Sequence, residues 1–308
     1  MLNADSPDNR DLVMIDWASP VVGPLLKRYF KAEVRGVENI PRGAALYVGN
    51  HNMGLLSLDS FIFGYEAYRA HGPGALPYGL GHDFAVTVPP WRNVVLKSGG
   101  IRANHENAHE VFSRRQKCIV YPGGDVDALR PWRDRNKIRF GGRTGYMELA
   151  LREEVPIVPI VTAGAHSAYM ILDDLQWLAH GLRMDRVLRT NVWPVTLCLP
   201  WGIFPGPPPV FIPWPTRILI QVLPPVRFDR SGPAAAADHA YVEQCSDKVE
   251  QAMQEVLTQL AVERDRLNGA EGKKRKKRAL GIPDRLAQRA RHAVASVRER
   301  GAARRFRE

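Results

Sequence analysis

The sequence predicts an α/β fold, a single domain with one mixed, mostly parallel sheet flanked by helices. The first observation is a set of short apolar segments bounded by glycine, proline or charged residues, as expected of buried strands, at residues 44–48, 117–121, 155–161 and 218–222. The second is helical periodicity in the stretches beside them, at residues 55–71, 104–115, 143–152 and 168–183. Strands that alternate with helices are typical of a mostly parallel sheet.

The chain of 308 residues divides into a domain and a tail. We assign residues 1–268 to the domain, whose motif-bearing core covers residues 32–226. A further helix at residues 236–266 is expected to pack against this core, since five apolar residues share one of its faces: Val242, Val249, Met253, Val256 and Leu260. Residues 269–308 form the tail.

The net charge of +11 belongs almost entirely to the tail. Residues 269–308 contain 14 Lys and Arg against 4 acids, whereas residues 1–268 contain 29 against 28. Six consecutive basic residues precede a predicted basic amphipathic helix that begins at Pro283 and ends at Gly301. We therefore expect residues 273–307 to contact an anionic membrane surface. The near-neutral domain disfavours nucleic acid as a partner.

The composition indicates a cytoplasmic protein attached peripherally to the inner face of the membrane. Three cysteines lie far apart without a CxxC pair, which supports neither disulfides nor a zinc site. The polar, acidic N-terminal stretch does not resemble a signal peptide. The longest uncharged stretch, residues 190–216, contains eight prolines and so cannot cross a bilayer as a helix. Its aromatic residues suit a headgroup interface, and a connection packed on the core is the alternative.

A histidine follows the first predicted strand in the stretch YVGNHNMGLLSLDSF, residues 47–61. A loop after a buried strand is a usual place for a catalytic group. His51 could take a proton from an alcohol if a carboxylate fixed its tautomer, and Asp59 is the nearest acid. Asp59 also lies where a helix is predicted to begin, so helix capping and pairing with His51 are both open.

A second group of polar residues occurs in CIVYPGGDVDALRPW, residues 118–132. Gly123 and Gly124 would let backbone N–H groups approach an oxyanion or a phosphate. Arg130 and Arg133 can pair with an anionic headgroup. The alternative is a tight turn whose charges balance locally in solvent.

Several other sites are disfavoured. The sequence contains no GxSxG, GxxxxGK or HExxH motif and no GxGxxG after a strand, which disfavours a serine hydrolase or a nucleotide enzyme. His105 and His109 lie one helical turn apart, but no third ligand is spaced to join them, so we predict no metal site. His166, after a predicted strand, is a further candidate for lining the site.

Four blocks of this sequence, in order, resemble the glycerolipid acyltransferases, which include the lysophosphatidic acid acyltransferases. The blocks are GNHNMGLLSLD, GGIRANHENA, VYPGGDVDALRP and VPIVPIVTAG. The likeness is nearer to the branch of the monoacylglycerol and diacylglycerol acyltransferases, because Asp59 follows His51 at a longer spacing than in the phosphate-acceptor enzymes and a PGG turn opens the third block. The resemblance implies a glycerol-phosphate-acyltransferase-like domain.

The resemblance also implies an activity, that of an O-acyltransferase. Such an enzyme moves a fatty acyl group from acyl-CoA or acyl-carrier protein to a hydroxyl of a glycerolipid or lysophospholipid, without a cofactor. His51 would be the general base and Asp59 would orient it. By analogy, five residues are candidates for holding the acceptor: Arg102, Gly123, Gly124, Arg130 and Arg143. A rival of a different class is a non-catalytic protein that binds anionic membrane or nucleic acid through its basic tail.

Overall fold

The computed structural model describes residues 2–305, apart from residues 55–56, 82–85, 87–90, 182, 185–189 and 209, and for residues 273–305 it describes the backbone alone. The chain forms two compact units, Met1–Ala261 and Val262–Glu308. The first unit carries every candidate site residue.

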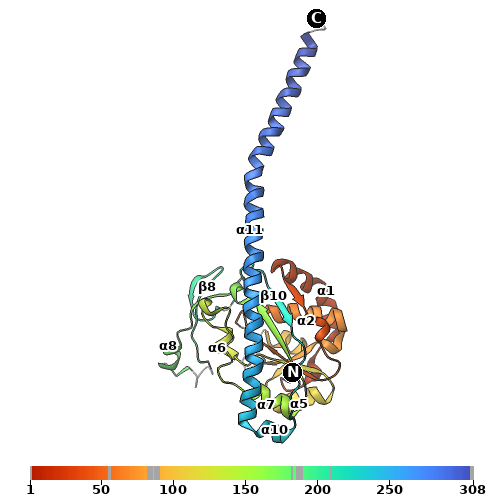
Figure 1. The fold of residues 1–308 in the computed structure, drawn as a ribbon, viewed down its shortest axis with the longest axis vertical. Coiled ribbons are helices and arrows are strands. Elements are labelled where there is room, and N and C mark those ends of the chain that lie inside the picture. Colours follow the sequence, from red (N-terminus) through yellow and green to blue (C-terminus); the bar gives the residue numbers. More distant parts are fainter. Residues whose placement is uncertain are drawn as a thin grey trace. The chain divides into compact units, whose positions relative to one another are not determined.

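A seven-stranded sheet forms the centre of the first unit (Figure 1), with the strand order β1-β10-β6-β2-β5-β3-β4. The strands are β1 (Glu33–Arg35), β2 (Ala45–Gly49), β3 (Pro77–Gly81), β4 (Gly100–Arg102), β5 (Lys117–Val120), β6 (Ile157–Ala163) and β10 (Leu219–Val222). Strands β2 to β6 are parallel, whereas β10 runs antiparallel to β6 and β1 is parallel to β10. The predicted mixed, mostly parallel sheet is confirmed.

Helices flank this sheet. They are α1 (Leu12–Tyr29), α2 (Leu58–His71), α4 (Trp91–Lys97), α5 (His105–Ser113), α6 (Gly124–Ala128), α7 (Gly145–Arg152), α8 (Gln176–Gly181), α10 (Pro233–Ala237) and α11 (His239–Arg305). Short 3-10 turns lie at Pro7–Asn9, Val37–Asn39, Pro73–Ala75, Trp132–Asp134 and Ala165–Ala168. Helices α2, α5 and α7 agree with predicted helices, whereas α1, capped by the Asp11 side chain, was not predicted.

A second, three-stranded antiparallel sheet consists of β7 (Met170–Asp173), β8 (Val195–Cys198) and β9 (Gly202–Pro205). The prediction of one helix at residues 168–183 is therefore wrong in its first part, where the chain forms β7 before α8. The uncharged stretch at residues 190–216 contributes β8 and β9 to this sheet. Thr196 and Cys198 of β8 are buried and alternate with partly exposed neighbours, the period of two that a half-covered sheet requires.

Helix α11 begins on the first unit. Val242, Val249, Met253 and Leu260 are buried, in agreement with the predicted apolar face. The backbone then continues as helix to Arg305, so the separate tail helix expected to begin at Pro283 is instead part of α11. No helix among the described residues combines the length and the apolar character that crossing a bilayer requires.

The central strand β2 positions the loop that carries His51. All five residues of β2 are buried between β5 and β6, and Tyr47 packs edge-on against Phe63 of α2 with ring centroids 5.4 Å apart. A Cβ at Gly49 would lie 2.6 Å from the ring of Tyr121. Glycine at this position therefore lets Tyr121 lie directly beside the end of β2.

Candidate functional site

The loop that carries His51 leaves β2 at the carboxyl edge of the sheet. Asn50, the first residue after β2, exchanges two hydrogen bonds of 2.9 and 2.8 Å with the backbone of Thr162 in β6. Because β2, β5 and β6 are parallel, the chain emerges after each strand at the same edge. The His51 loop and the turn after β5 therefore lie close together.

A buried ion pair holds the backbone of His51 from both sides. The His51 N–H donates to Asp127 Oδ2 at 2.6 Å, and the His51 carbonyl accepts from Arg130 Nη1 at 2.7 Å. Asp127 and Arg130 pair with each other at 2.9 Å, and neither side chain is exposed. Burial raises the pKa of Asp127 and lowers that of Arg130, and their mutual attraction opposes both shifts. We call this pair the clamp, since each charge compensates the other and both fix His51.

The imidazole of His51 is neutral at pH 7. Burial lowers the pKa of His51 to about 4; the charge of Arg130 acts in the same direction, and a contact with the Asn52 backbone acts against it. Nδ1 lies 3.3 Å from the Ser57 hydroxyl, and the ring lies against Tyr121 with centroids 4.7 Å apart. A neutral imidazole is the form that a general base requires.

Asp59 lies in the first turn of α2 and is 3% exposed. Oδ2 accepts from Asn52 Nδ2 at 3.0 Å, whereas Oδ1 has no well-aligned hydrogen bond among the described residues, although the Thr162 hydroxyl helps to lower its pKa. Burial is the larger effect and raises the pKa of Asp59 to about 6. Within the described part of the loop, no hydrogen bond joins Asp59 to His51, and Ser57 is the partner of Nδ1.

Asn52 connects Asp59 to the clamp. Its amide nitrogen donates to Asp59, and its amide oxygen accepts from Arg130 Nη2 at 2.9 Å. Arg130 also donates to the carbonyl of Arg135 at 3.1 Å, and its own carbonyl lies 2.6 Å from Nε2 of the buried His166. The guanidinium predicted to hold a headgroup is thus used inside the protein.

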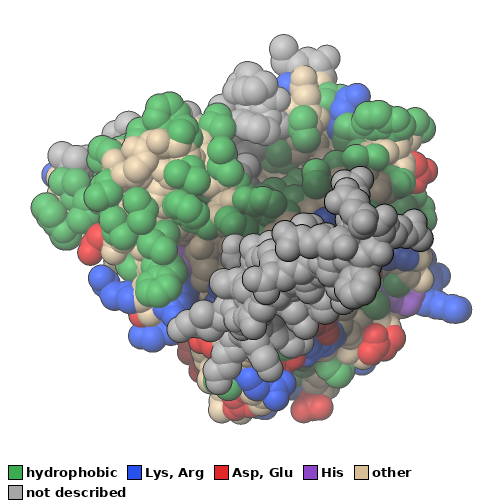
Figure 2. Space-filling view, turned by 90° about the horizontal axis from the view of Figure 1, so that it is seen from above, with side chains coloured by type: hydrophobic (Ala, Val, Ile, Leu, Met, Phe, Trp, Pro, Cys, Tyr) green, Lys and Arg blue, Asp and Glu red, His purple; other side chains and the backbone are tan. Residues whose placement is uncertain are grey.

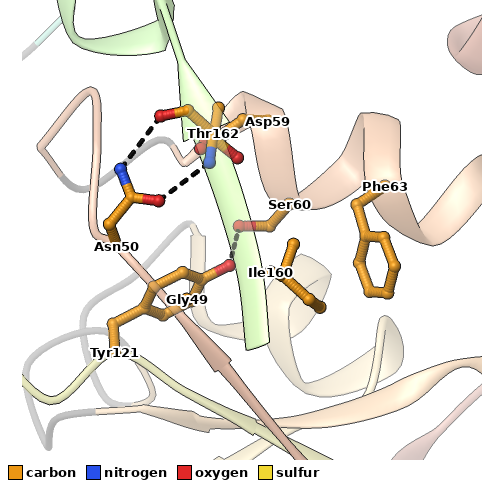
Figure 3. A pocket seen from close by; sticks show the side chains of 8 residues that line it. All are labelled: Gly49, Asn50, Asp59, Ser60, Phe63, Tyr121, Ile160 and Thr162. Carbon is orange, nitrogen blue, oxygen red and sulfur yellow. Dashed lines mark hydrogen bonds between the residues drawn. The ribbon is translucent and has the colours of Figure 1, made fainter. Parts of the chain in front are cut away.

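A small pocket lies beside Asp59 (Figure 3). Its wall includes the hydroxyls of Ser60 and Tyr121, which are hydrogen-bonded to each other, and the apolar side chains of Phe63 and Ile160. Burial, with a contribution from the Asp59 carboxylate, raises the pKa of Tyr121, so this phenol stays protonated. The space is about that of one water molecule, too small for an acyl chain.

The glycine turn after β5 admits protein groups at close range. A Cβ at Gly124, where φ is +50°, would lie 2.5 Å from Arg143 Nη1, and a Cβ at Gly123 would lie 2.3 Å from a backbone carbonyl oxygen. Arg143 donates to the Gly123 carbonyl at 2.7 Å and pairs with Asp125 at 3.1 Å, yet its side chain is 42% exposed. The Gly124 N–H already donates to the carbonyl of Tyr121 at 3.0 Å.

Arg102 lies apart from these groups. It ends β4, the edge strand of the sheet, and pairs with Asp5 at 3.2 Å. Three strand spacings separate β4 from β2, a distance of about 14 Å. The structure therefore brings His51, Asp59 and the glycine turn together but leaves Arg102 outside the group.

Residues 31–163 match the acyltransferase family. The matched span contains His51, Asp59, the clamp and the glycine turn, and it ends with β6. The chain belongs to this family.

Individual relatives of this acyltransferase-family chain are distant. An uncharacterized protein of Mycobacterium tuberculosis (strain ATCC 25618 / H37Rv) is 30% identical over 248 residues, 79% of this chain and 66% of that protein. Diacylglycerol O-acyltransferase 2 of Homo sapiens is 24% identical over 170 residues, 53% of this chain and 43% of that protein. The chain thus spans about two thirds or less of these relatives. The crystal structure of the 1-acyl-sn-glycerophosphate acyltransferase PlsC from Thermotoga maritima is similar with a TM-score of 0.48 and 16% identity, covering 82% of this chain and 83% of PlsC.

Asp127 and Ser57 hydrogen-bond to His51 in this acyltransferase domain, and neither contact was predicted. Asp127 lies in the third block and Ser57 in the first, but their contacts depend on how the two loops meet, which spacing alone does not reveal. Across the described residues, no group of three or more His, Cys, Asp or Glu side chains could hold a metal ion, and His109 pairs instead with Glu153 at 2.7 Å.

Proposed function

We propose that this protein is an O-acyltransferase that moves a fatty acyl group from acyl-CoA or acyl-carrier protein to a hydroxyl of a glycerolipid or lysophospholipid. The observation that carries this proposal is a neutral histidine, held by both of its backbone groups, at the carboxyl edge of the sheet and inside the span that matches the family. The similarity to diacylglycerol O-acyltransferase 2 supports a glycerolipid acceptor.

In the proposed reaction, His51 takes the proton of the acceptor hydroxyl as the oxygen attacks the thioester carbonyl. The tetrahedral intermediate then expels the thiolate, which receives the proton from His51, and the new ester leaves. No acyl-enzyme is required. Positioned general-base help of this kind contributes roughly 100-fold to 10,000-fold.

We propose that Asp59 stabilises the imidazolium that forms on His51. With a pKa of about 6, its carboxyl group is ionised for the most part at pH 7. For direct contact, Nδ1 of His51 must exchange the Ser57 hydroxyl for the Asp59 carboxylate. Catalytic hydrogen bonds commonly tighten in this way only when substrate is bound.

The other predicted residues take different parts in this proposal. Arg130 positions His51 and does not contact the acceptor, because its guanidinium is buried and hydrogen-bonded within the protein. Arg143 is partly exposed above the glycine turn and can donate to a polar group of the acceptor, while Gly123 and Gly124 make room for it. Arg102, about 14 Å from β2, would reach only a distant part of a substrate.

The direct test supplies purified protein with mass-tagged acyl-CoA or acyl-carrier protein and a panel of lysophospholipids, monoacylglycerols and diacylglycerols. We expect mass spectrometry to detect an acylated product of at least one acceptor. An absence of product for every donor and acceptor would refute the proposal.

Two variants separate the partners of His51. Asp59→Asn should lower kcat more than Ser57→Ala, because only the carboxylate stabilises an imidazolium. If kcat falls in Ser57→Ala but not in Asp59→Asn, Asp59 takes no part in the mechanism.

We also propose that the basic tail holds the protein at an anionic membrane surface. The charge split supports this, since each Lys or Arg near such a surface contributes about 1 kcal/mol. Deletion of residues 269–308 should weaken binding to phosphatidylserine vesicles and leave acyl transfer to detergent-dispersed lipid intact. If DNA displaces the protein from the vesicles and the protein shows no preference for lipid over DNA, this would favour the rival in which the tail binds nucleic acid.

A further inference from the structure

Residues 135–139 contact both members of the clamp. The carbonyl of Arg135 accepts from Arg130 Nη2 at 3.1 Å, and the Arg139 N–H donates to Asp127 Oδ1 at 3.2 Å. The two ends of this short stretch therefore each bind one charge of the pair that fixes the histidine. We call residues 135–139 the support segment.

The backbone of the support segment lies outside the helices and sheets. The segment follows the 3-10 turn Trp132–Asp134, and residues 137–139 take no regular structure. Ile138 is buried, whereas its neighbour Lys137 is exposed. Backbone N–H and C=O groups near a buried position need hydrogen-bond partners, and here no helix or sheet ladder supplies them.

Gln254 of α11 supplies partners for this backbone. Its side-chain oxygen accepts from the Ile138 N–H at 2.8 Å, and its side-chain nitrogen donates to the Asn136 carbonyl at 3.0 Å. A residue of a neighbouring parallel strand would make the same two bonds, one on either side of the residue opposite it. One glutamine side chain thus takes the place of a strand partner for the support segment.

Gln254 belongs to a polar row on α11. Ser246, Glu250 and Gln254 follow one another at every fourth position and so share one face of the helix. The Ser246 hydroxyl lies 3.0 Å from that of Tyr146, and Glu250 Oε1 accepts from the Phe140 N–H at 3.5 Å. The row holds α11 against the stretch that follows the clamp, and Gln254 is the member that binds the support segment itself.

We propose that Gln254 is a positioning residue for acyl transfer, acting on His51 through the support segment and the clamp. This rests on the proposed function, in which His51 is the general base. Each link is a hydrogen bond of 3.2 Å or less: Gln254 to the support segment, the support segment to the clamp, and the clamp to the backbone of His51. The span that matches the family ends at residue 163, so it does not include α11.

The rate is sensitive to this support because the reacting groups must be closely aligned. Without Gln254, the Arg135 carbonyl and the Arg139 N–H lose the anchor that holds them at the clamp, and the His51 backbone can shift with the clamp. A displacement of about 1 Å in a reacting group can cost about 100-fold in rate. Gln254 binds the protein backbone and not the substrate, so its loss should lower kcat and leave KM nearly unchanged.

Gln254→Met tests the proposal, because methionine is also unbranched, has a similar helix propensity and removes both hydrogen bonds. We expect it to lower kcat by about tenfold to 100-fold with little change in the KM of either substrate. Gln254→Asn keeps the amide on a side chain one methylene shorter and should behave in the same way. Gln251→Met is the matched control, because Gln251 is exposed on the same helix and its amide donates to Glu255 of that helix; it should keep the wild-type kcat.

Figure 2 shows hydrophobic side chains gathered on one face of the molecule. Rates are therefore compared with the lipid dispersed in a single detergent, which this face meets alike in every variant. Urea unfolding checks that each variant is folded.

A second readout follows the backbone N–H of His51, whose chemical shift depends on its hydrogen bond to Asp127. In ¹⁵N-histidine NMR, the His51 cross-peak is the one that His51→Gln lacks. This cross-peak should move in Gln254→Met and stay in place in Gln251→Met. A role of Gln254 in stability alone would lower the urea midpoint and leave the cross-peak where it is.

The outcomes separate this proposal from the enzymatic one. A wild-type kcat or an unmoved His51 cross-peak in the folded Gln254→Met and Gln254→Asn proteins would overturn the role of Gln254 and leave the enzyme. A cross-peak that moves in both variants, in a protein whose wild type transfers no acyl group, would refute the enzyme and retain the link from Gln254 to His51.

Discussion

Replacing Asp59 by Asn should stabilise the protein at neutral pH. The Asp59 carboxyl is 3% exposed, and burial raises its pKa from 3.8 to about 6. Above pH 6 the folded protein therefore holds a buried charge that costs free energy. Asn has nearly the same shape, keeps an oxygen that can accept from Asn52, and carries no charge.

The size and the pH dependence of this effect follow from the two pKa values. Between pH 3.8 and about 6 the folded state binds a proton that the unfolded chain has lost, so the contribution of Asp59 to stability falls as the pH rises through this window. The full cost at pH 7.5 is about 3 kcal/mol, and the cost at pH 4.5 is about 1 kcal/mol. Asp59→Asn should recover these amounts.

Urea unfolding of the wild type and Asp59→Asn at both pH values provides the assay, with the free energy of unfolding taken from linear extrapolation. We expect the variant to be more stable by about 3 kcal/mol at pH 7.5 and by about 1 kcal/mol at pH 4.5. A variant that is no more stable at pH 7.5, or whose gain is the same at both pH values, would refute this view of Asp59.

Three further predictions concern His51 and its supports. First, His51 should stay neutral on acidification to pH 5, because burial lowers its pKa to about 4. ¹³C-histidine NMR measures this, with the His51 signal assigned as the one that His51→Gln lacks. A titration midpoint of that signal near pH 6.5 would contradict the prediction. Arg130→Lys should cost about 3 kcal/mol or more of unfolding free energy, since the clamp is fully buried, and an unchanged urea midpoint would contradict it. Gly123→Ala should lower the free energy of unfolding by about 1–3 kcal/mol and so lower the thermal midpoint, because its Cβ would lie 2.3 Å from a carbonyl oxygen. Gly74→Ala is the control and should change the thermal midpoint little, because nothing lies within 4 Å of its Cβ position.

The sheet was predictable because its central strands are buried on both faces. Residues 44–48 and 155–161 are apolar throughout, and the structure places β2 and β6 there within two residues. The edge strands β1 and β4 contain only three residues each, too few for a pattern to emerge. Helix α1 was missed for a different reason: its second half contains Pro20, Gly23 and Pro24, which are poor helix formers and do not indicate a helix in the sequence.

Within the site, His51 could be found because a polar residue follows an apolar strand. Its contacts could not, because they join segments far apart in the chain: Asp127 and Arg130 lie 76 and 79 residues beyond it. Sequence position suggested that Arg130 faces a substrate, but the structure turns it inward to the His51 carbonyl. Similarly, the nearness of Asp59 in sequence did not reveal that Ser57 is the group at Nδ1.

The most direct test of the central claim is the rate of acyl transfer by His51→Ala beside His105→Ala, which changes an exposed histidine of α5. With the acceptor identified from the lipid panel and circular dichroism spectra equal to that of the wild type, His51→Ala should lose roughly 100-fold to 10,000-fold in kcat. His105→Ala should keep the wild-type rate. A folded His51→Ala protein that transfers acyl groups as fast as the wild type would contradict the assignment of His51 as the general base.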